Sequence, residues 1–167
     1  MKKKKNRIDE ISIQMLSACD GANKTVEQEL LREIQQLDDI NQKGRDGRTL
    51  LIHASCYDLR EIVAFLLSKN AEINAGDDIG YTALHAAVTL KHIEIAKMLL
   101  SHGAEVNATD AYGNTPLQRA SHLDPNMISV LMEAGADPTI CNNFGISPLT
   151  SFAAYPEILE ILEGKRN

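Results

Sequence analysis

The chain has 167 residues, of which 44% are hydrophobic and 24% charged, and its formal net charge is −6. No apolar run approaches the roughly 20 residues that a membrane-spanning helix needs, so a membrane protein is not expected. An acidic surface repels nucleic-acid phosphates, which argues against nucleic-acid binding as well. The three cysteines lack a C-x-x-C spacing, and this favours reduced thiols and a cytoplasmic location.

The N-terminal part lacks the repeat pattern of the later chain but contains two helical stripes. Residues 1–7 hold five basic side chains. We expect them to form a disordered basic tail, as runs of like charge usually do. Such a tail attracts a membrane surface only transiently. Within residues 8–44 the apolar positions indicate one helix over 8–18 and a second over 26–37. This pair is predicted to be an N-terminal helical capping repeat.

A period of about 33 residues governs the rest of the chain. Four glycines are spaced by 33, 33 and 32 residues, each followed two positions later by Thr or Ser: Gly47, Gly80, Gly113 and Gly145. The glycines suit turns that need a positive φ, and the hydroxyl residues suit helix N-caps. Such a period is typical of stacked helix pairs. Residues 45–163 are therefore predicted to form three full repeats and a truncated C-terminal cap repeat.

Two blocks carry a recognisable motif, Thr82-Ala83-Leu84-His85 and Thr115-Pro116-Leu117. With these residues the chain resembles the ankyrin-repeat family over roughly residues 40–163. The resemblance implies an all-α solenoid of stacked helix-turn-helix units with short β-hairpin-like loops. It also implies that His85 bridges neighbouring loops by hydrogen bonds. A protein partner is then expected along the loop tips and the exposed side of each first helix.

No residue pattern points to catalysis. None of the five histidines has a recognised metal-ligand spacing, no glycines are spaced as in a phosphate-binding loop, and no serine or cysteine lies in a nucleophile motif. We therefore expect a protein that is not an enzyme and that uses neither a metal nor another cofactor. His53 and His122, on first helices, are candidates for facing a partner.

Eleven residues occupy variable positions of the predicted binding surface, either one residue from a turn glycine or ten residues after it. These candidate partner-binding residues are Arg48, Tyr57, Ile79, Tyr81, Leu90, Tyr112, Asn114, Leu123, Phe144, Ile146 and Tyr155. They include every tyrosine of the chain, and tyrosine is favoured in binding surfaces because it presents a rigid area and a hydroxyl group. An acidic rim is expected from Asp46, Asp77, Asp78, Asp110 and Asp124. The alternative is that the aromatic tips only pack against neighbouring tips.

The charge is uneven along the chain. From Gly103 to Glu163 there are eight acidic residues and one basic residue, Arg119. This acidity either attracts a basic protein partner or serves solubility alone. The favoured interpretation is a monomeric protein-protein interaction module, for instance an inhibitor or bacterial immunity-type protein that masks a basic partner. The alternative is an adaptor or effector scaffold that binds a host or endogenous enzyme.

Overall fold

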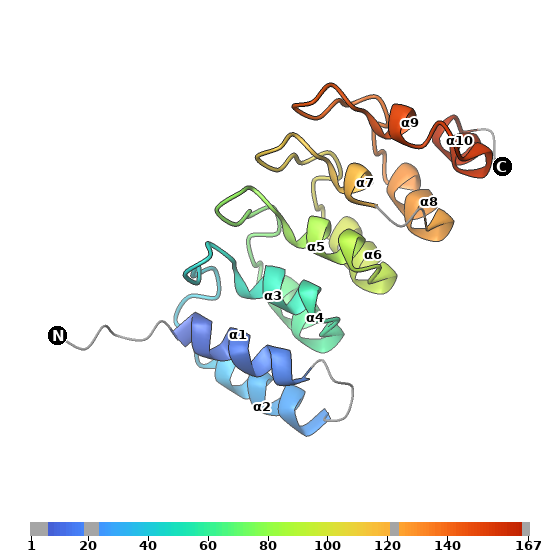
Figure 1. Ribbon diagram of the computed structural model, residues 1–167. Helices are drawn as coiled ribbons and strands as arrows, with labels where there is room; N and C mark the ends of the chain where they lie inside the picture. The colour runs from blue at the N-terminus through green and yellow to red at the C-terminus, as the bar shows by residue number, and fades with distance from the viewer. Residues whose placement is uncertain (1–6, 19–23, 121–123, 165–167) are drawn as a thin grey trace.

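The fold is a row of stacked helix pairs, seen in a computed structural model that describes residues 7–18, 24–120 and 124–164. Its helices are α1 (Arg7–Ala18), α2 (Lys24–Gln35), α3 (Leu50–Cys56), α4 (Arg60–Ser68), α5 (Ala83–Thr89), α6 (Ile93–Ser101), α7 (Pro116–Arg119), α8 (Pro125–Glu133), α9 (Pro148–Ser151) and α10 (Pro156–Leu162). Consecutive helices pair, the pairs stack, and the loops project to one side (Figure 1). The described ranges contain no strand, so the predicted all-α solenoid is confirmed.

The first helix of each repeat begins where the sequence predicts. Thr49, Thr82, Thr115 and Ser147 are the N-caps, and each side chain accepts a hydrogen bond from the backbone N–H three residues later. The turn glycines just before them have φ between 71° and 77°, in the left-handed region. Pro116 and Pro148 occupy the first helical position, where the missing N–H has no intrahelical partner to lose.

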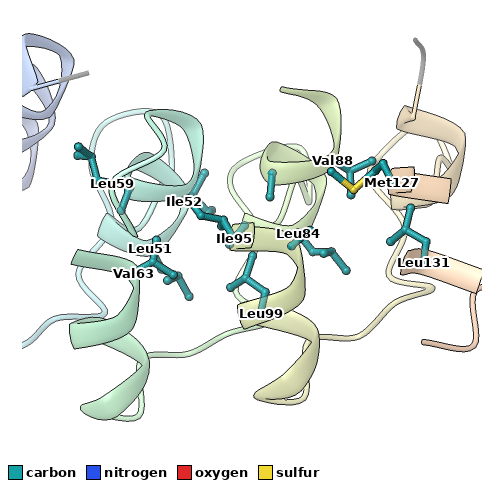
Figure 2. Close-up of a cluster of buried hydrophobic side chains, with 14 of the residues drawn as sticks. Leu51, Ile52, Leu59, Val63, Leu84, Val88, Ile95, Leu99, Met127 and Leu131 are labelled. Atoms are coloured by element: carbon teal, nitrogen blue, oxygen red, sulfur yellow. The ribbon is translucent and has the colours of Figure 1, made fainter. Parts of the chain in front are cut away.

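The core is a continuous band of aliphatic side chains between the helix pairs. First helices pack on first helices, from α1 through α3 and α5 to α7, while second helices form a parallel layer from α2 to α8. Figure 2 shows the contact zone, where Leu51, Leu84 and Leu99 are almost wholly buried. Each such side chain stabilises the fold by about 1.5–3 kcal/mol. Ala54 and Ala87 are also buried, and their small size lets the helices approach closely.

The two ends of the stack are helical. In α1, Ile8, Ile11 and Met15 are buried against the following helices. Arg7 is the first residue of α1, so its assignment to the disordered tail is wrong, and residues 1–6 lie outside the described ranges. At the other end α10 buries Ile158 and packs on α8.

Four hairpin-like turns project from the stack, and we call them fingers 1 to 4: residues 44–48, 77–81, 110–114 and 142–146. In each finger the N–H of the first residue donates to the carbonyl of the last, at 2.8–3.1 Å. Asparagines on the 33-residue register join neighbouring repeats at the base of the fingers. Asn41, Asn74 and Asn107 each accept the backbone N–H of a residue in the next repeat, at 2.8–2.9 Å.

Candidate functional site

Each of fingers 2 to 4 is held in shape by one acidic or amide side chain at its first position. Asp77 Oδ1 accepts the N–H groups of Ile79 and Tyr81 at 3.1 and 2.9 Å. Asp110 and Asn142 do the same in fingers 3 and 4, at 2.9–3.1 Å. Asp77 and Asp110 are therefore buried, and their assignment to an exposed acidic rim is wrong. The signal that sequence reasoning missed is an Asp or Asn three residues before the turn glycine.

Arginine side chains neutralise the two buried aspartates. Arg48 Nε lies 3.3 Å from Asp77 Oδ2, and Arg119 Nε lies 3.0 Å from Asp110 Oδ2, with a second close contact from Arg119 Nη2. Burial alone would raise the pKa of Asp110, but the bonds from Arg119 and from two backbone N–H groups outweigh it and hold that pKa below its usual range. Arg119 also lies over the Tyr81 ring, 5.9 Å from its centroid.

Finger 1 has a glycine, Gly44, where fingers 2 and 3 have an aspartate, and a carboxylate of helix α1 binds a different backbone N–H group of this finger. Asp9 Oδ1 accepts the N–H of Arg45 at 2.9 Å, and Asp9 Oδ2 lies 3.3 Å from Arg45 Nε. A Cβ added to Gly44 would lie 2.8 Å from Asp9 Oδ1, so the glycine leaves room for this carboxylate. The capping helices are thus tied directly to the row of fingers.

Side chains at the third helical position bridge one finger to the next. His85 Nε2 donates to the Asn114 carbonyl at 3.0 Å, while its Nδ1 accepts the N–H of Thr82 at 3.2 Å. The predicted bridging role of His85 is confirmed, and burial lowers its pKa, which favours the neutral ring that these two bonds require. Gln118 Nε2 takes the same role by donating to the Ile146 carbonyl at 2.6 Å.

His53 does not face outward as expected. Its side chain is buried, and its Nε2 lies 3.9 Å from Asp46 Oδ1, while Nδ1 has no hydrogen-bond partner among the described residues. Burial lowers the pKa of His53. His122 lies outside the described residues. No group of three His, Cys, Asp or Glu side chains in the described ranges could hold a metal ion.

Six of the eleven candidate partner-binding side chains are exposed large apolar groups: Ile79, Leu90, Tyr112, Phe144, Ile146 and Tyr155. The carbonyls of the tip residues Ile79 and Tyr112 accept N–H groups of the next finger, at 2.7 and 2.9 Å, so the tips are aligned across fingers 2 to 4. The exposed fraction of the tip residue rises along this row, from 42% at Ile79 to 72% at Phe144.

The other five candidates differ from the expectation. Tyr81 is half-buried, because its hydroxyl donates to Thr89 Oγ1 at 2.8 Å and its ring lies against His85. Tyr57, Arg48 and Asn114 are also only partly exposed. The fifth, Leu123, lies outside the described residues.

Two exposed apolar residues were not predicted. Ile13 and Leu16 on α1 are 69% and 54% exposed. Ile13 is four residues after Asp9, so the two residues lie on the same face of α1. Asp9 on this face contacts finger 1. The signal that could have found them is the apolar excess of this segment, because α1 has more apolar residues than its single buried stripe requires.

Comparison with protein families agrees with this architecture. A family model described as ankyrin repeats (3 copies) matches residues 2–78 and 75–142. The chain therefore belongs to the ankyrin-repeat family, whose members typically act as non-enzymatic modules that bind other proteins. Comparison with curated proteins gives no match. In the described ranges, no helix combines the length and the apolar content that crossing a bilayer requires.

Proposed function

We propose that this chain is a non-enzymatic, monomeric, cytoplasmic module that binds a protein partner through its finger tips and the exposed ends of its first helices. The observation that carries the proposal is the set of six large apolar side chains exposed in register on the fingers and helix ends. Monomeric proteins rarely expose aligned apolar groups unless these groups make contacts. The hydrogen bonds between fingers support the proposal further, because a rigid backbone lowers the entropy lost on binding.

The charge of the chain favours a partner of basic surface. Acidic residues outnumber basic ones eight to one between Gly103 and Glu163, and the one basic residue, Arg119, is paired with a buried aspartate. The exposed charge of this half is therefore acidic, which accelerates encounter with a basic partner and disfavours nucleic acid.

Within this proposal the chain acts as an inhibitor or immunity-type protein that masks a basic partner. The second candidate is an adaptor or effector scaffold that holds a host or endogenous enzyme. The two differ in affinity: a masking protein must bind at about nanomolar Kd or tighter, whereas an adaptor can operate at about micromolar Kd. Calorimetric measurement of Kd with the identified partner decides between them.

The experiment that tests protein binding compares the immobilised full chain with a variant in which all six exposed candidate side chains are changed to Ser. Both are incubated with an extract of the source cells, and the retained proteins are identified by mass spectrometry. We expect a basic protein that the wild type retains at least ten times more strongly than the variant. Equal retention by the folded variant, or no specific retention at all, would refute the proposal.

A further inference from the structure

The fingers are joined in a row by backbone hydrogen bonds that run in one direction. The N–H of Ala111, the second residue of finger 3, donates to the carbonyl of Ile79 at the tip of finger 2, at 2.7 Å. In the same way the N–H of Asn143 in finger 4 donates to the carbonyl of Tyr112 in finger 3, at 2.9 Å. A finger of this row therefore turns a donor edge toward the finger before it and an acceptor edge toward the finger after it.

The two ends of the row differ. At finger 1 the donor edge is closed, because the N–H of the second residue, Arg45, donates to Asp9 Oδ1 of α1 at 2.9 Å. Finger 4 is the last finger, just before α9 (Figure 1). Within the described ranges no group donates to its carbonyls at Asn143 and Phe144. Both corresponding carbonyls of finger 3 accept hydrogen bonds from finger 4. Finger 4 thus presents an open acceptor edge.

The space beside the acceptor edge is open as well. A Cβ added to Gly113 of finger 3 would lie 2.9 Å from the backbone nitrogen of Asn143, whereas a Cβ added to Gly145 would meet nothing within 4 Å. Phe144 is 72% exposed, more than any other exposed large apolar side chain in the described ranges, and Ile146 is 45% exposed. An apolar edge with available backbone acceptors can be extended by another chain segment through main-chain hydrogen bonds.

The backbone that carries these acceptors is firmly held. Asn142 Oδ1 accepts the N–H groups of Phe144 and Ile146 at 3.0 and 3.1 Å. Asn142 Nδ2 donates to Asn114 Oδ1 at 3.0 Å, which ties finger 4 to finger 3. An incoming segment therefore finds the carbonyls in fixed positions, and less conformational entropy is lost on binding.

The helices at the same end do not offer a surface for a further helix pair. On α9 and α10 the exposed residues are Thr150, Ser151, Pro156, Glu157 and Glu160. A further pair would have to cover these residues, and burying polar and charged groups costs free energy unless they find partners. The open surface is thus confined to the finger, which has room for a loop and not for a whole repeat.

A second copy of the chain does not complement the acceptor edge. Two copies that meet finger 4 to finger 4 would place carbonyl acceptors against carbonyl acceptors. A copy that brings its finger 1 to this edge would have to use the N–H of Arg45, which already donates to Asp9. Neither arrangement supplies the missing donors, so the complementary segment belongs to a different protein.

We infer that the partner binds finger 4 with a hairpin turn that takes the place of a fifth finger. This inference rests on the proposed function and names the contact that the partner makes. The turn donates a backbone N–H to the Phe144 carbonyl and a side-chain amide to the Asn143 carbonyl, as finger 4 itself does toward finger 3. An apolar residue at the tip of the turn packs on Phe144. The complementary sequence is therefore asparagine, an apolar residue and glycine, the order found in finger 4.

The probe is a cyclic peptide of residues 140–148 with Cys141→Ser and Pro148→Thr, closed by a D-Pro–Gly turn. It presents the same turn that already fits the acceptor edge of finger 3. A second peptide is N-methylated at the residue corresponding to Asn143, which removes the N–H donor. A third peptide carries Asn143→Ala, which removes the side-chain amide. NMR of the three peptides alone verifies that each forms the turn, and their binding to the ¹⁵N-labelled full chain is measured by NMR titration.

Two variants of the full chain accompany the wild type. Gly145→Asn fills the space beside the acceptor edge, and Gly103→Asn is the matched control away from the fingers. Both glycines have a positive φ, 74° and 88°, and at neither would an added Cβ meet an atom within 4 Å. Asparagine tolerates such a φ, and Asn70 adopts a φ of 58° at the position that corresponds to Gly103. Thermal unfolding verifies that both variants are folded.

We expect the first peptide to bind and to shift the amide signals of finger 4. Its Kd should rise at least about tenfold in Gly145→Asn and stay within about twofold in Gly103→Asn. The N-methylated peptide and the Asn143→Ala peptide should each bind at least about tenfold more weakly than the first, because each lacks one of the donors.

Four results would overturn the inference: no binding of the first peptide up to about 1 mM, equal binding of the N-methylated peptide, equal Kd values in the two variants, or shifts that leave finger 4 unaffected. Signals of finger 4 that move with protein concentration alone would assign the edge to a second copy and also overturn it. If Gly145→Asn does not fold, the comparison of the first and the N-methylated peptide on the wild type decides.

The same variant separates this inference from the proposed function. If the native partner is retained equally by the wild type and by Gly145→Asn, but is lost when all six exposed candidates are changed, protein binding stands and the turn at finger 4 is refuted. If no protein is retained by any form, the proposed function fails and this inference fails with it.

Discussion

Replacing Asp110 by alanine should destabilise the chain by about 3–5 kcal/mol, because it breaks a buried ion pair and removes the acceptor that shapes finger 3. The Asp110 side chain has no exposed surface. It accepts the N–H groups of Tyr112 and Asn114, both at 2.9 Å, and Arg119 Nε at 3.0 Å. Each buried donor left without an acceptor costs about 1–3 kcal/mol, which is consistent with the same range.

The fourth repeat shows how to separate the two contributions, because it forms the same finger without an ion pair. There Asn142 replaces the aspartate, and Ser151 stands at the position of Arg119. Asp110→Asn alone keeps an oxygen for the two N–H groups but leaves the guanidinium unpaired, at a cost of about 2–3 kcal/mol. Adding Arg119→Ser removes the unpaired charge and should recover at least about 1 kcal/mol.

Urea unfolding followed by far-UV circular dichroism gives the free energies for the wild type, the single variants Asp110→Ala, Asp110→Asn and Arg119→Ser, and the double variant Asp110→Asn with Arg119→Ser. The reasoning is refuted if Asp110→Ala lowers the free energy of unfolding by less than about 1 kcal/mol, since breaking a buried ion pair destabilises a protein by more than that. It is also refuted if the changes at Asp110 and Arg119 are additive, because residues in direct contact should couple.

Three further outcomes are expected. Tyr81→Ala should lower the free energy of unfolding by about 2–4 kcal/mol, because the contacts of a half-buried ring and a hydrogen bond from its hydroxyl are lost. Tyr112→Ala should change it by no more than about 0.5 kcal/mol, because that ring is exposed. Equal shifts of the melting temperature in the two variants would contradict this. Since burial lowers the pKa of His85, the unfolded state takes up a proton at higher pH than the folded state does, and the contribution of this residue to stability is lost as pH falls below about 6.5. His85→Gln should keep the bridge and reduce the slope of the free energy of unfolding against pH by up to about 1.4 kcal/mol per pH unit. An unchanged slope in urea unfolding at several pH values would be the contrary result. Asp9→Ala should lower the free energy of unfolding by about 1 kcal/mol. Gly44→Asp would crowd Asp9 in the wild type but should restore stability in the Asp9→Ala variant. A further loss of stability in this double variant would show that the two carboxylates are not equivalent.

Local interactions explain why so much of the backbone could be predicted from the sequence. A turn glycine, an N-cap hydroxyl and a proline act within a few residues of themselves, so Gly113, Thr115 and Pro116 already define the end of finger 3 and the start of α7. The 33-residue period then requires that the helix pairs stack, because a single pair cannot bury its apolar face. The same period placed most of the exposed apolar tips correctly.

Only the tertiary structure decided which loop residues are buried. Asp77 and Asp110 look like solvated carboxylates in the sequence, yet they are enclosed because each meets an arginine that lies 29 or 9 residues away. The Tyr81 hydroxyl reaches Thr89 on the following helix, and Asp9 reaches finger 1 from 36 residues before it. These contacts depend on how closely neighbouring repeats approach, and local sequence patterns do not encode that distance. The sequence alone could therefore place a side chain on a finger but could not say which residues would bury it.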